Sequence, residues 1–191
     1  SNAEDLRISN SLFESNNAAE NGGAIDCNGT KMNLTYTDFI SNNAQYGAAL
    51  CREKLATGGF GHDNKFITNN ATVAGAALAW IQSQSISIDT YYFYDNVAGQ
   101  KGGAIYVGEG SGNCEIINST FERNYVANET AGEGGAIEWN AEKGTVLNSS
   151  FTYNHAYNGG AICVGPTSGK INFTNSNFTR NKAVELGGAI R

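Results

Sequence analysis

The sequence repeats one pattern seven times. Each unit holds a Phe, an Asn three residues later, and then a run of small residues ending in Ile or Leu. Successive Phe residues lie 26 to 30 positions apart. The seven pairs are Phe13 with Asn16, Phe39 with Asn42, Phe66 with Asn69, Phe93 with Asn96, Phe121 with Asn124, Phe151 with Asn154, and Phe178 with Asn181. A fixed period of this size predicts units that stack and bury their apolar faces against one another.

The apolar positions within a unit indicate strands. Ile86 and Ile88 alternate with polar residues ahead of the Phe, and the position five before the Phe is apolar in six of seven units. Asn-Ser pairs such as Asn118-Ser119 follow this strand, and their side chains can bend the chain. Each unit is therefore predicted to be a strand, a bend, a strand, a turn and a further strand.

The run of small residues predicts a tight corner. It reads Gly-Gly-Ala-Ile in five units and Gly-Ala-Ala-Leu in the units of Gly47 and Gly75. Glycine permits a positive φ or a close backbone approach that larger residues would block. Two positions after the motif Asn comes Ala in six units and Val126 in the fifth, so we expect room for small groups only.

Stacking in register would place like residues above one another, about 4.8 Å apart. The Phe residues would form one column, and the Asn residues another in which amides exchange hydrogen bonds between coils. The predicted fold is all-β, a single-stranded parallel β-helix of about seven coils and roughly 30 Å in length. The alternative is a series of hairpins or propeller blades, but a blade needs about 40 residues.

Tandem Phe-x-x-Asn followed by Gly-Gly-Ala-Ile/Leu/Val resembles two known sets of repeats. They are those of the chlamydial polymorphic outer membrane proteins and of the adhesin-like surface proteins of methanogenic archaea. The likeness extends from Ile8 to Ile190, and the units of Gly47 and Gly75 depart from it at the second Gly. The resemblance implies a right-handed helix and a passenger-type role at a cell surface.

The chain length fits one domain over residues 4–191. Ser1-Asn2-Ala3 resembles the remnant of tag cleavage, and Arg191 directly follows a seventh run, so we expect a fragment of a longer repeat protein. The net charge of −6 argues against nucleic acid and anionic membrane surfaces as partners. The apolar stretches are too short to span a bilayer. We expect a monomer apart from end-to-end contacts at the cut coils.

Sequons and cysteines bear on the compartment. Eight Asn-x-Ser/Thr sequons fit an exported protein; they begin at Asn28, Asn33, Asn70, Asn118, Asn128, Asn148, Asn172 and Asn177. The four cysteines share no repeat position and form no Cys-x-x-Cys, which argues against zinc. Cys27 and Cys51 differ in strand parity, so we expect free buried thiols over a disulfide; Cys114 and Cys163 are the others.

The candidate chemical groups do not predict a catalytic site. The position after each Ile or Leu should face outward, and its carboxylates, Asp26 and Glu138, lie four coils apart, roughly 19 Å at the strand spacing. The rest of that row is Cys51, Ala79, Tyr106, Cys163 and Arg191. His62 and His155 are interpreted as solvated loop residues without a neighbouring carboxylate or nucleophile.

The fifth unit is crowded with acidic residues. Glu129, Glu133, Glu138 and Glu142 could hold a cation, but no Asp/Gly calcium signature frames them, so we expect a solvated acidic loop. No catalytic, cofactor-binding or metal-ligating residue is therefore predicted.

The most specific candidate contact surface follows the motif Phe. That position should face outward and holds Ile40, Ile67 and Tyr94 in three successive units, with Tyr92 beside them. We call these four residues the strip. Two interpretations stay open: packing that stabilises the sheet, or a contact for a partner.

Two other features could serve recognition. Trp80 and Trp139 have inward parity and are expected in the core rather than as a sugar platform. The longest insertion, residues 125–133, is a loop of the kind that carries recognition.

Together these features predict a non-enzymatic, extracellular, adhesin-like β-helix segment that displays loops and the strip to a cell-surface glycan or protein. One alternative is a carbohydrate-active β-helix enzyme, a polysaccharide lyase or hydrolase, with its site outside this chain or spread across its coils. Another is a purely structural surface stalk.

Overall fold

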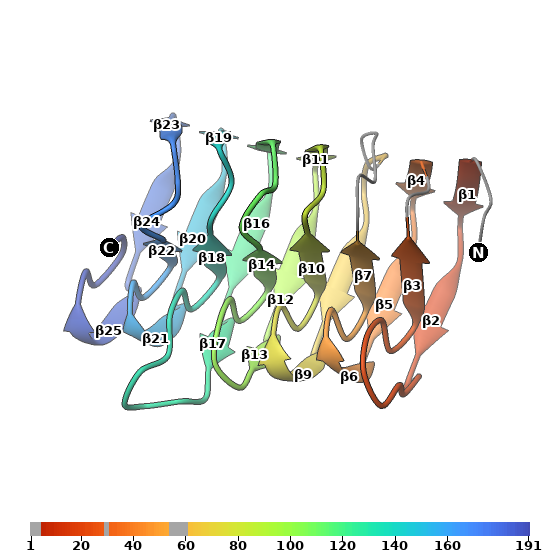
Figure 1. The fold of residues 1–191 in the computed structure, drawn as a ribbon, viewed down its shortest axis with the longest axis horizontal. Helices are drawn as coiled ribbons and strands as arrows, with labels where there is room; N and C mark the ends of the chain where they lie inside the picture. Colours follow the sequence, from red (N-terminus) through yellow and green to blue (C-terminus); the bar gives the residue numbers. More distant parts are fainter. Residues whose placement is uncertain (1–4, 29–30, 54–60) are drawn as a thin grey trace.

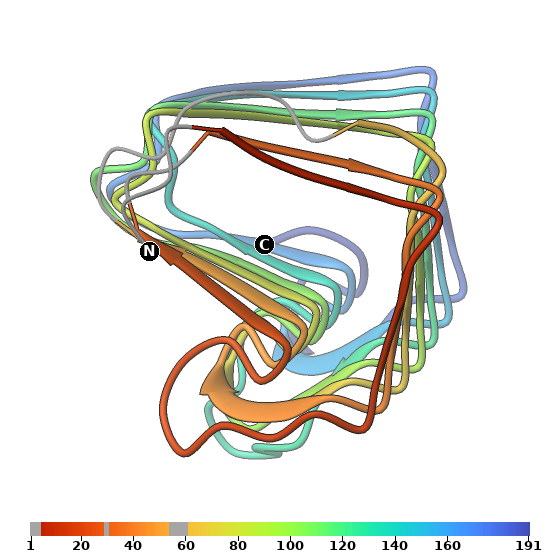
Figure 2. The same ribbon diagram turned by 90° about the vertical axis from the view of Figure 1, so that its right-hand side faces the viewer.

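The structure is a computed structural model that describes residues 5–28, 31–53 and 61–191. These residues form 25 strands and no helix. Every pairing between strands is parallel, and the strands lie side by side along one axis (Figure 1). Seen from the N-terminal end, the chain turns clockwise as it recedes, which is a right-handed helix (Figure 2). The predicted parallel β-helix is confirmed, with about six full turns.

The described strands form four faces along the stack, one face more than the three strands per unit that the sequence predicts. The first face contains β1 (Asp5–Ser9) paired with β4 (Lys31–Thr35), then β11 (Ser85–Asp89), β15 (Asn113–Ile117), β19 (Lys143–Leu147) and β23 (Lys170–Thr174). The second face contains β2 (Leu12–Glu14), β5 (Asp38–Ile40), β8 (Lys65–Ile67), β12 (Tyr92–Tyr94), β16 (Thr120–Glu122), β20 (Ser150–Thr152) and β24 (Asn177–Thr179).

The other two faces lie on either side of the glycine corner. The third face contains β6 (Asn43–Tyr46), β9 (Asn70–Ala74), β13 (Val97–Ala98), β17 (Tyr125–Val126), β21 (His155–Asn158) and β25 (Lys182–Leu186). The fourth face contains β3 (Ile25–Asn28), β7 (Leu50–Glu53), β10 (Leu78–Ile81), β14 (Ile105–Val107), β18 (Ile137–Trp139) and β22 (Ile162–Val164). Among the residues that the structure describes, none belongs to a helix long and apolar enough to cross a membrane.

The motif Phe residues form a column of stacked rings behind the second face. Neighbouring ring centroids lie 4.5 to 5.1 Å apart, and the rings are nearly parallel. The five central rings are fully buried, whereas Phe13 and Phe178 at the two ends are partly exposed. The strand register thus converts the sequence period into one continuous aromatic core.

The motif Asn residues form a hydrogen-bonded ladder at the next bend. Asn96 is typical: its Nδ2 donates to Asn124 Oδ1 at 2.9 Å and to the carbonyl of Phe66 at 2.9 Å. Its Oδ1 accepts the backbone N–H and the Nδ2 of Asn69, both at 3.0 Å. The amide is buried yet fully bonded, which removes the cost of placing it in the interior.

The ladder continues to the last two motif asparagines, Asn154 and Asn181. The Nδ2 of Asn154 donates to Asn181 Oδ1 at 2.9 Å and to the carbonyl of Phe121 at 3.0 Å. The Nδ2 of Asn181 donates to the carbonyl of Phe151 at 2.8 Å. Asn154 is fully buried, but Asn181 is only half-buried, so the ladder is less shielded at this end than in its middle. Both side chains bond the ladder and the backbone, which is the structural role that the repeat predicts for them.

A left-handed bend precedes each Asn of the ladder, and the sequence analysis did not predict it. We call it the second left-handed bend, because another lies at the glycine corner. The residue before each motif Asn has a positive φ although none of them is glycine, as at Asp95 and Arg123. The N–H of the following Asn then donates to the Asn Oδ1 of the next coil, so the ladder stabilises this conformation. The other members are Ser15, Ser41, Thr68, Tyr153 and Arg180.

The glycine corner has the same geometry in all seven units. The first Gly of each run has φ between 54° and 69°, including Gly47 and Gly75. At the second position, a Cβ on Gly135 would lie 2.1 Å from the carbonyl oxygen of Gly160. Ala48 and Ala76 stand at this position in the two divergent units and are buried in a small alanine cluster. The departure from Gly-Gly therefore leaves the corner unchanged.

The inner side of the fourth face fills the remaining core. Trp80 and Trp139 are buried there, and Trp139 occupies space that a Cβ on Gly144 would need. Arg52 pairs in register with Trp80 and is also buried, a charged inward residue that the sequence analysis missed.

The four cysteines are free and buried, as predicted. Cys27 on β3 points into the main apolar core. Cys51 on the paired strand β7 lies on the other side of the fourth face, as its different strand parity predicts.

Candidate functional site

The strip lies on the outer side of the second face. Ile40, Ile67 and Tyr94 are in register on β5, β8 and β12, and all three are half-buried. The ring of Tyr92 stacks on that of Tyr94 with centroids 5.9 Å apart. Lys65 and Asp38 flank the row with charged groups 3.8 Å apart. The strip is therefore one continuous apolar row beside a polar margin.

The strip ends at a carboxylate. Tyr94 pairs in register with Glu122, and the Tyr92 hydroxyl donates to Glu122 Oε2 at 3.2 Å. Burial, and then the nearby Glu122 charge, raise the pKa of Tyr92 to about 12. The Tyr92 hydroxyl therefore stays protonated at neutral pH and keeps its hydrogen bond to Glu122.

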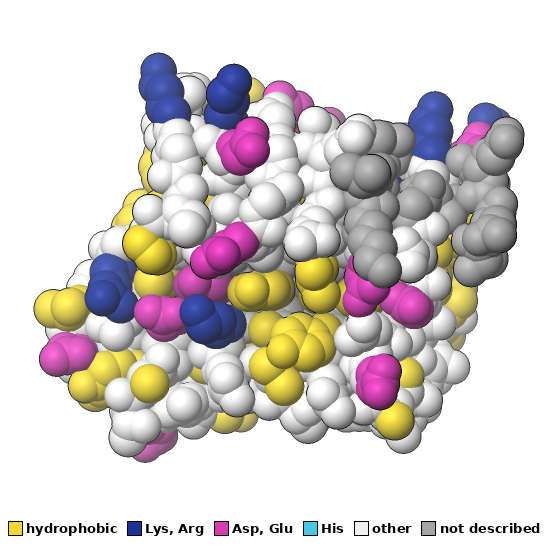
Figure 3. Space-filling view, viewed as in Figure 1, with side chains coloured by type: hydrophobic (Ala, Val, Ile, Leu, Met, Phe, Trp, Pro, Cys, Tyr) yellow, Lys and Arg dark blue, Asp and Glu magenta, His cyan; other side chains and the backbone are white. Residues whose placement is uncertain are grey.

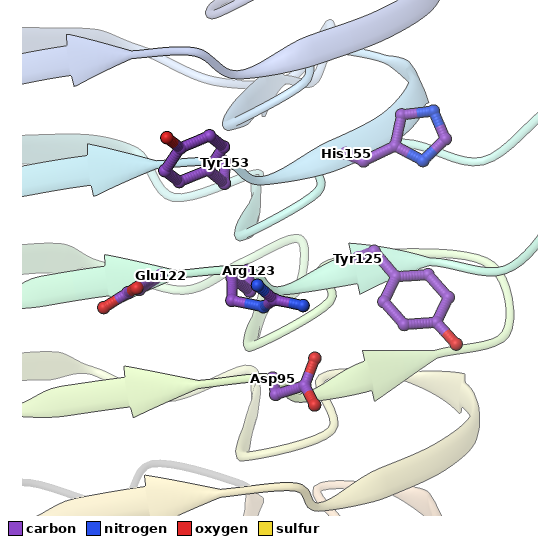
Figure 4. Close-up of a pocket in the computed structure, with 6 residues that line it drawn as sticks. All are labelled: Asp95, Glu122, Arg123, Tyr125, Tyr153 and His155. Carbon is purple, nitrogen blue, oxygen red and sulfur yellow. The ribbon is translucent and has the colours of Figure 1, made fainter.

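Beyond Glu122 the surface is hollowed at the corner between the second and third faces. We call this cavity of about 430 Å³ the corner hollow. It is lined by Asp95, Glu122, Arg123, Tyr125, Tyr153 and His155 (Figure 4). Tyr125 and Tyr153 are 38% and 46% exposed, so both rings are open to a partner. The guanidinium of Arg180 packs over the Tyr153 ring and donates to its hydroxyl.

The corner hollow depends on the second left-handed bend, which explains why the sequence analysis missed it. Asp95, Arg123 and Tyr153 occupy this bend in three successive coils, and their side chains differ too much to show a pattern. The interpretation of His155 as a solvated loop residue is wrong. It lies in β21, half-buried, and its Nε2 finds no hydrogen-bond partner among the described residues.

His62 also differs from expectation. Its Nδ1 lies 2.7 Å from the carboxylate of Asp63, the next residue, so a neighbouring carboxylate is present. Both side chains are well exposed.

A second cavity lies on the outer side of the fourth face. We call this cavity of about 530 Å³ the polar hollow. It is lined by Lys101, Tyr106, Glu109, Glu133, Glu138, Asn140, Cys163, Val164, Gly165, Pro166 and Arg191. Charged side chains of both signs gather there, midway down the face and toward the C-terminal end of the stack (Figure 3).

Lys101 joins two carboxylates in the polar hollow. Its Nζ lies 2.8 Å from Glu133 Oε2 and 3.6 Å from Glu138 Oε1, and Arg191 lies 3.3 Å from Glu133 Oε1. Glu138 therefore has Glu133 as its neighbouring carboxylate, and not Asp26, the other carboxylate of its row. Lys101 and Glu133 precede the glycine corner in adjacent coils, and the corner turns them toward the strand that carries Glu138.

The prediction that Glu138 belongs to a solvated acidic loop is also wrong, because its side chain is only 2% exposed. Its Oε1 accepts a hydrogen bond from Asn140 Nδ2 at 3.2 Å. Burial raises the pKa of Glu138, and Lys101 opposes that rise. Glu129 and Glu142 are exposed, and the described residues contain no group of three His, Cys, Asp or Glu side chains placed to hold a metal.

Comparison with known proteins defines the class of the repeat. The sequence model of the Chlamydia polymorphic membrane protein repeat matches residues 10–28, 90–108 and 148–165. Each matched segment runs from the bend before the second face, through the Phe, the Asn and the glycine corner, to the strand of the fourth face. No curated protein and no solved structure matches the chain.

The chain is thus a parallel β-helix, and three of its segments match the polymorphic membrane protein repeat. Such repeats are those of surface or outer-membrane-associated proteins, and their family is not known for enzymatic activity.

Proposed function

We propose that this chain is a non-enzymatic, extracellular segment that binds a protein on a cell surface in an adhesin-like manner. The observation that carries the proposal is the continuity of the strip with the corner hollow. Ile40, Ile67 and Tyr94 form an apolar row that passes through Glu122 into a cavity flanked by Tyr125. Apolar anchors beside tyrosines and a polar rim are typical of protein interfaces.

The chemistry of the row favours a protein over a glycan. Ile40 and Ile67 offer aliphatic surface without hydrogen-bonding groups, and this surface suits an apolar side chain better than a hydroxyl-rich sugar. Tyr92 and Glu122 at the end of the row then supply polar groups that can fix the orientation of the partner.

The inner columns support a role in display. The Phe and Asn columns hold every coil in register, so the outer side chains occupy fixed positions before any partner arrives. A preorganised surface loses less conformational freedom on binding than a flexible one.

An extracellular location is supported by the repeat family and by the sequons. Seven of the eight sequon asparagines are exposed, and Asn128 is half-buried. Attachment of a glycan at these positions would not disturb the buried columns.

The test compares a strip variant with a matched control on the same face. Ile67→Ser with Tyr94→Ser alters the strip, whereas Thr152→Ser with Thr179→Ser alters the same outward row three coils further on. Fluorescently labelled protein is added to a panel of cultured cells. We expect the strip variant to attach about tenfold less than the wild type while its melting midpoint stays nearly the same, and the control variant to attach normally.

The other outcomes each reject a stated part of the proposal. Retained attachment of the strip variant would show that the strip is not the contact, and a large loss of stability would assign it to sheet packing. Loss of attachment after glycosidase rather than protease treatment of the cells would identify a glycan. No attachment of the wild type to any cell would favour a structural stalk.

The carbohydrate-active enzyme keeps one specific observation in its favour, the neighbouring carboxylates of Glu133 and Glu138. Paired carboxylates can perform acid/base chemistry on a glycosidic bond. Incubation with a panel of polysaccharides, followed by measurement of released sugar, decides the question. We expect no release, and release abolished by Glu138→Gln would replace the binding proposal with an enzymatic one.

A further inference from the structure

We propose that the polar hollow is a binding site for a neutral sugar, with Glu138 and Lys101 as its main hydrogen-bonding groups. The site lies on the outer side of the fourth face, whereas the strip lies on the second. The inference rests on the proposed role at a cell surface, where glycans are abundant ligands, but it uses different residues.

Glu138 has one carboxylate oxygen without a nitrogen or oxygen donor among the described residues. Glu138 is 2% exposed and lines the cavity, and its Oε1 is bonded to Asn140 and lies near Lys101. Its Oε2 is also shielded from solvent and accepts no hydrogen bond from a nitrogen or oxygen atom of the described residues. The thiol of Cys163, a weak donor, is its neighbour in register. A buried carboxylate oxygen that accepts no strong hydrogen bond would be stabilised by a ligand that donates one.

The lining of the polar hollow presents both donors and acceptors. Lys101 and Arg191 present N–H donors, whereas Glu133 and Glu138 present acceptors. A sugar hydroxyl donates one hydrogen bond and accepts others, so adjacent hydroxyls can engage an ammonium and a carboxylate together.

Part of the lining is apolar. Tyr106 is half-buried and precedes Glu138 by one coil in the same outward row. Its ring, together with Pro166, offers surface for the C–H face of a sugar. The cavity volume of about 530 Å³ falls in the range of small-molecule sites.

The charges select the kind of sugar. Three carboxylates, those of Glu109, Glu133 and Glu138, face two cations, those of Lys101 and Arg191. An acidic sugar would bring its charge toward this excess of carboxylates, and a neutral sugar avoids that repulsion.

A purely structural role explains the arrangement poorly. Burial raises the pKa of Glu138, so keeping the carboxylate ionised at neutral pH costs stability even beside Lys101. A neutral side chain of the same size would serve packing at least as well. Groups retained at such a cost are typical of functional sites.

The experiment uses the purified protein and a panel of free sugars followed by titration calorimetry. The panel contains neutral disaccharides such as lactose and chitobiose, the amine glucosamine and the acid glucuronate. We expect at least one neutral disaccharide to bind and glucuronate not to bind. Glu138→Gln and Tyr106→Ala should each weaken that binding about tenfold or more, whereas Glu115→Gln, on the first face, should leave it unchanged.

Stability and cell attachment make the outcomes decisive. Glu138→Gln should fold with an unchanged or higher melting midpoint at neutral pH, and Tyr106→Ala provides an independent variant from the lining. Preference for glucuronate, or full binding by both variants, would overturn the assignment. If no sugar binds while the strip still mediates attachment to cells, this inference fails alone. If attachment also fails, the proposed function fails with it.

Discussion

Replacing Asn96 by Ala removes one rung from the middle of the asparagine ladder. The Asn96 side chain has two donated and two accepted hydrogen bonds, all between 2.9 and 3.0 Å and all buried. The substitution leaves the backbone N–H of Asn69, one Nδ2 hydrogen of Asn69 and the carbonyl of Phe66 without this partner. Asn124 Oδ1 keeps the backbone N–H of residue 96.

The free energy of unfolding should fall by about 3 to 5 kcal/mol. Each buried polar group left without a partner costs about 1 to 3 kcal/mol, and three such groups in one place do not add fully. Asn16 supplies the matched control. It lies in the first coil, is half-buried, and within the described part of the chain its side chain donates only to Asn42 Oδ1, which also accepts the Asn16 N–H. Asn16→Ala should therefore cost about 1 kcal/mol or less.

Asn96→Asp separates hydrogen bonding from shape. Aspartate has the size of asparagine but cannot donate to Phe66 and Asn124, and at neutral pH it places a buried charge against the Asn124 oxygen. It should therefore destabilise more than Ala and recover partly in acid, where its carboxyl becomes a donor. Urea denaturation followed by far-ultraviolet circular dichroism measures all three variants. If Asn96→Asp is milder than Asn96→Ala, the ladder acts by filling space, and the hydrogen-bond argument is wrong.

Three further predictions concern the other columns, the corner and the strip. Phe93→Ala removes a buried ring stacked on both sides and should cost about 3 to 5 kcal/mol in urea, clearly more than Phe13→Ala at the partly exposed end; equal losses would contradict a continuous core. Gly102→Ala places a Cβ 2.0 Å from the carbonyl of Ile105 and should lower the melting midpoint far more than Gly110→Ala, which has a similar positive φ but open space. Folded Tyr92 holds its proton up to about pH 12, above its ordinary pKa of 10.0, so its contribution to stability is complete below about pH 10 and is lost as the pH rises to about 12. Burial also raises the pKa of Tyr91 and Tyr106, so the tyrosinate absorbance gained near pH 12 should fall in Tyr92→Phe by the share of one residue, and an unchanged titration curve would refute the assignment.

The inner columns could be predicted because their positions repeat in kind. The 26 to 30 residue spacing of Phe requires parallel coils, and once coils stack in register, Phe must lie on Phe and Asn on Asn. The glycine corner could be predicted because the first Gly of each run can adopt the positive φ that a tight corner needs. The fourth strand and the second left-handed bend could not be predicted, because residues as different as Ser41, Asp95 and Tyr153 share that bend. Their conformation is imposed by the Asn ladder rather than by their own preference.

The cavities were harder to predict because they join residues from different parts of the unit. Glu133 lies ahead of the glycine corner, Glu138 lies beyond it, and Lys101 comes from the preceding coil. Counting along a single row cannot bring them together. A search of both sides of each corner for opposite charges in adjacent coils would have found this cluster.

The difference between inner and outer rows also bears on function. A row that keeps one residue type through every coil, as Phe does, is required by stacking, and a change there should affect the fold. The outward row that holds Tyr106, Glu138 and Cys163 changes in kind from one coil to the next, so stacking does not dictate its residues. The outward row of the second face also changes in kind, from Ile67 and Tyr94 to Glu122 in the next coil, so stacking does not dictate its residues either. Because these outer side chains stand on a scaffold stabilised by the Phe and Asn columns, we expect that each can be exchanged without unfolding its coil, so that the strip and the polar hollow can be tested independently.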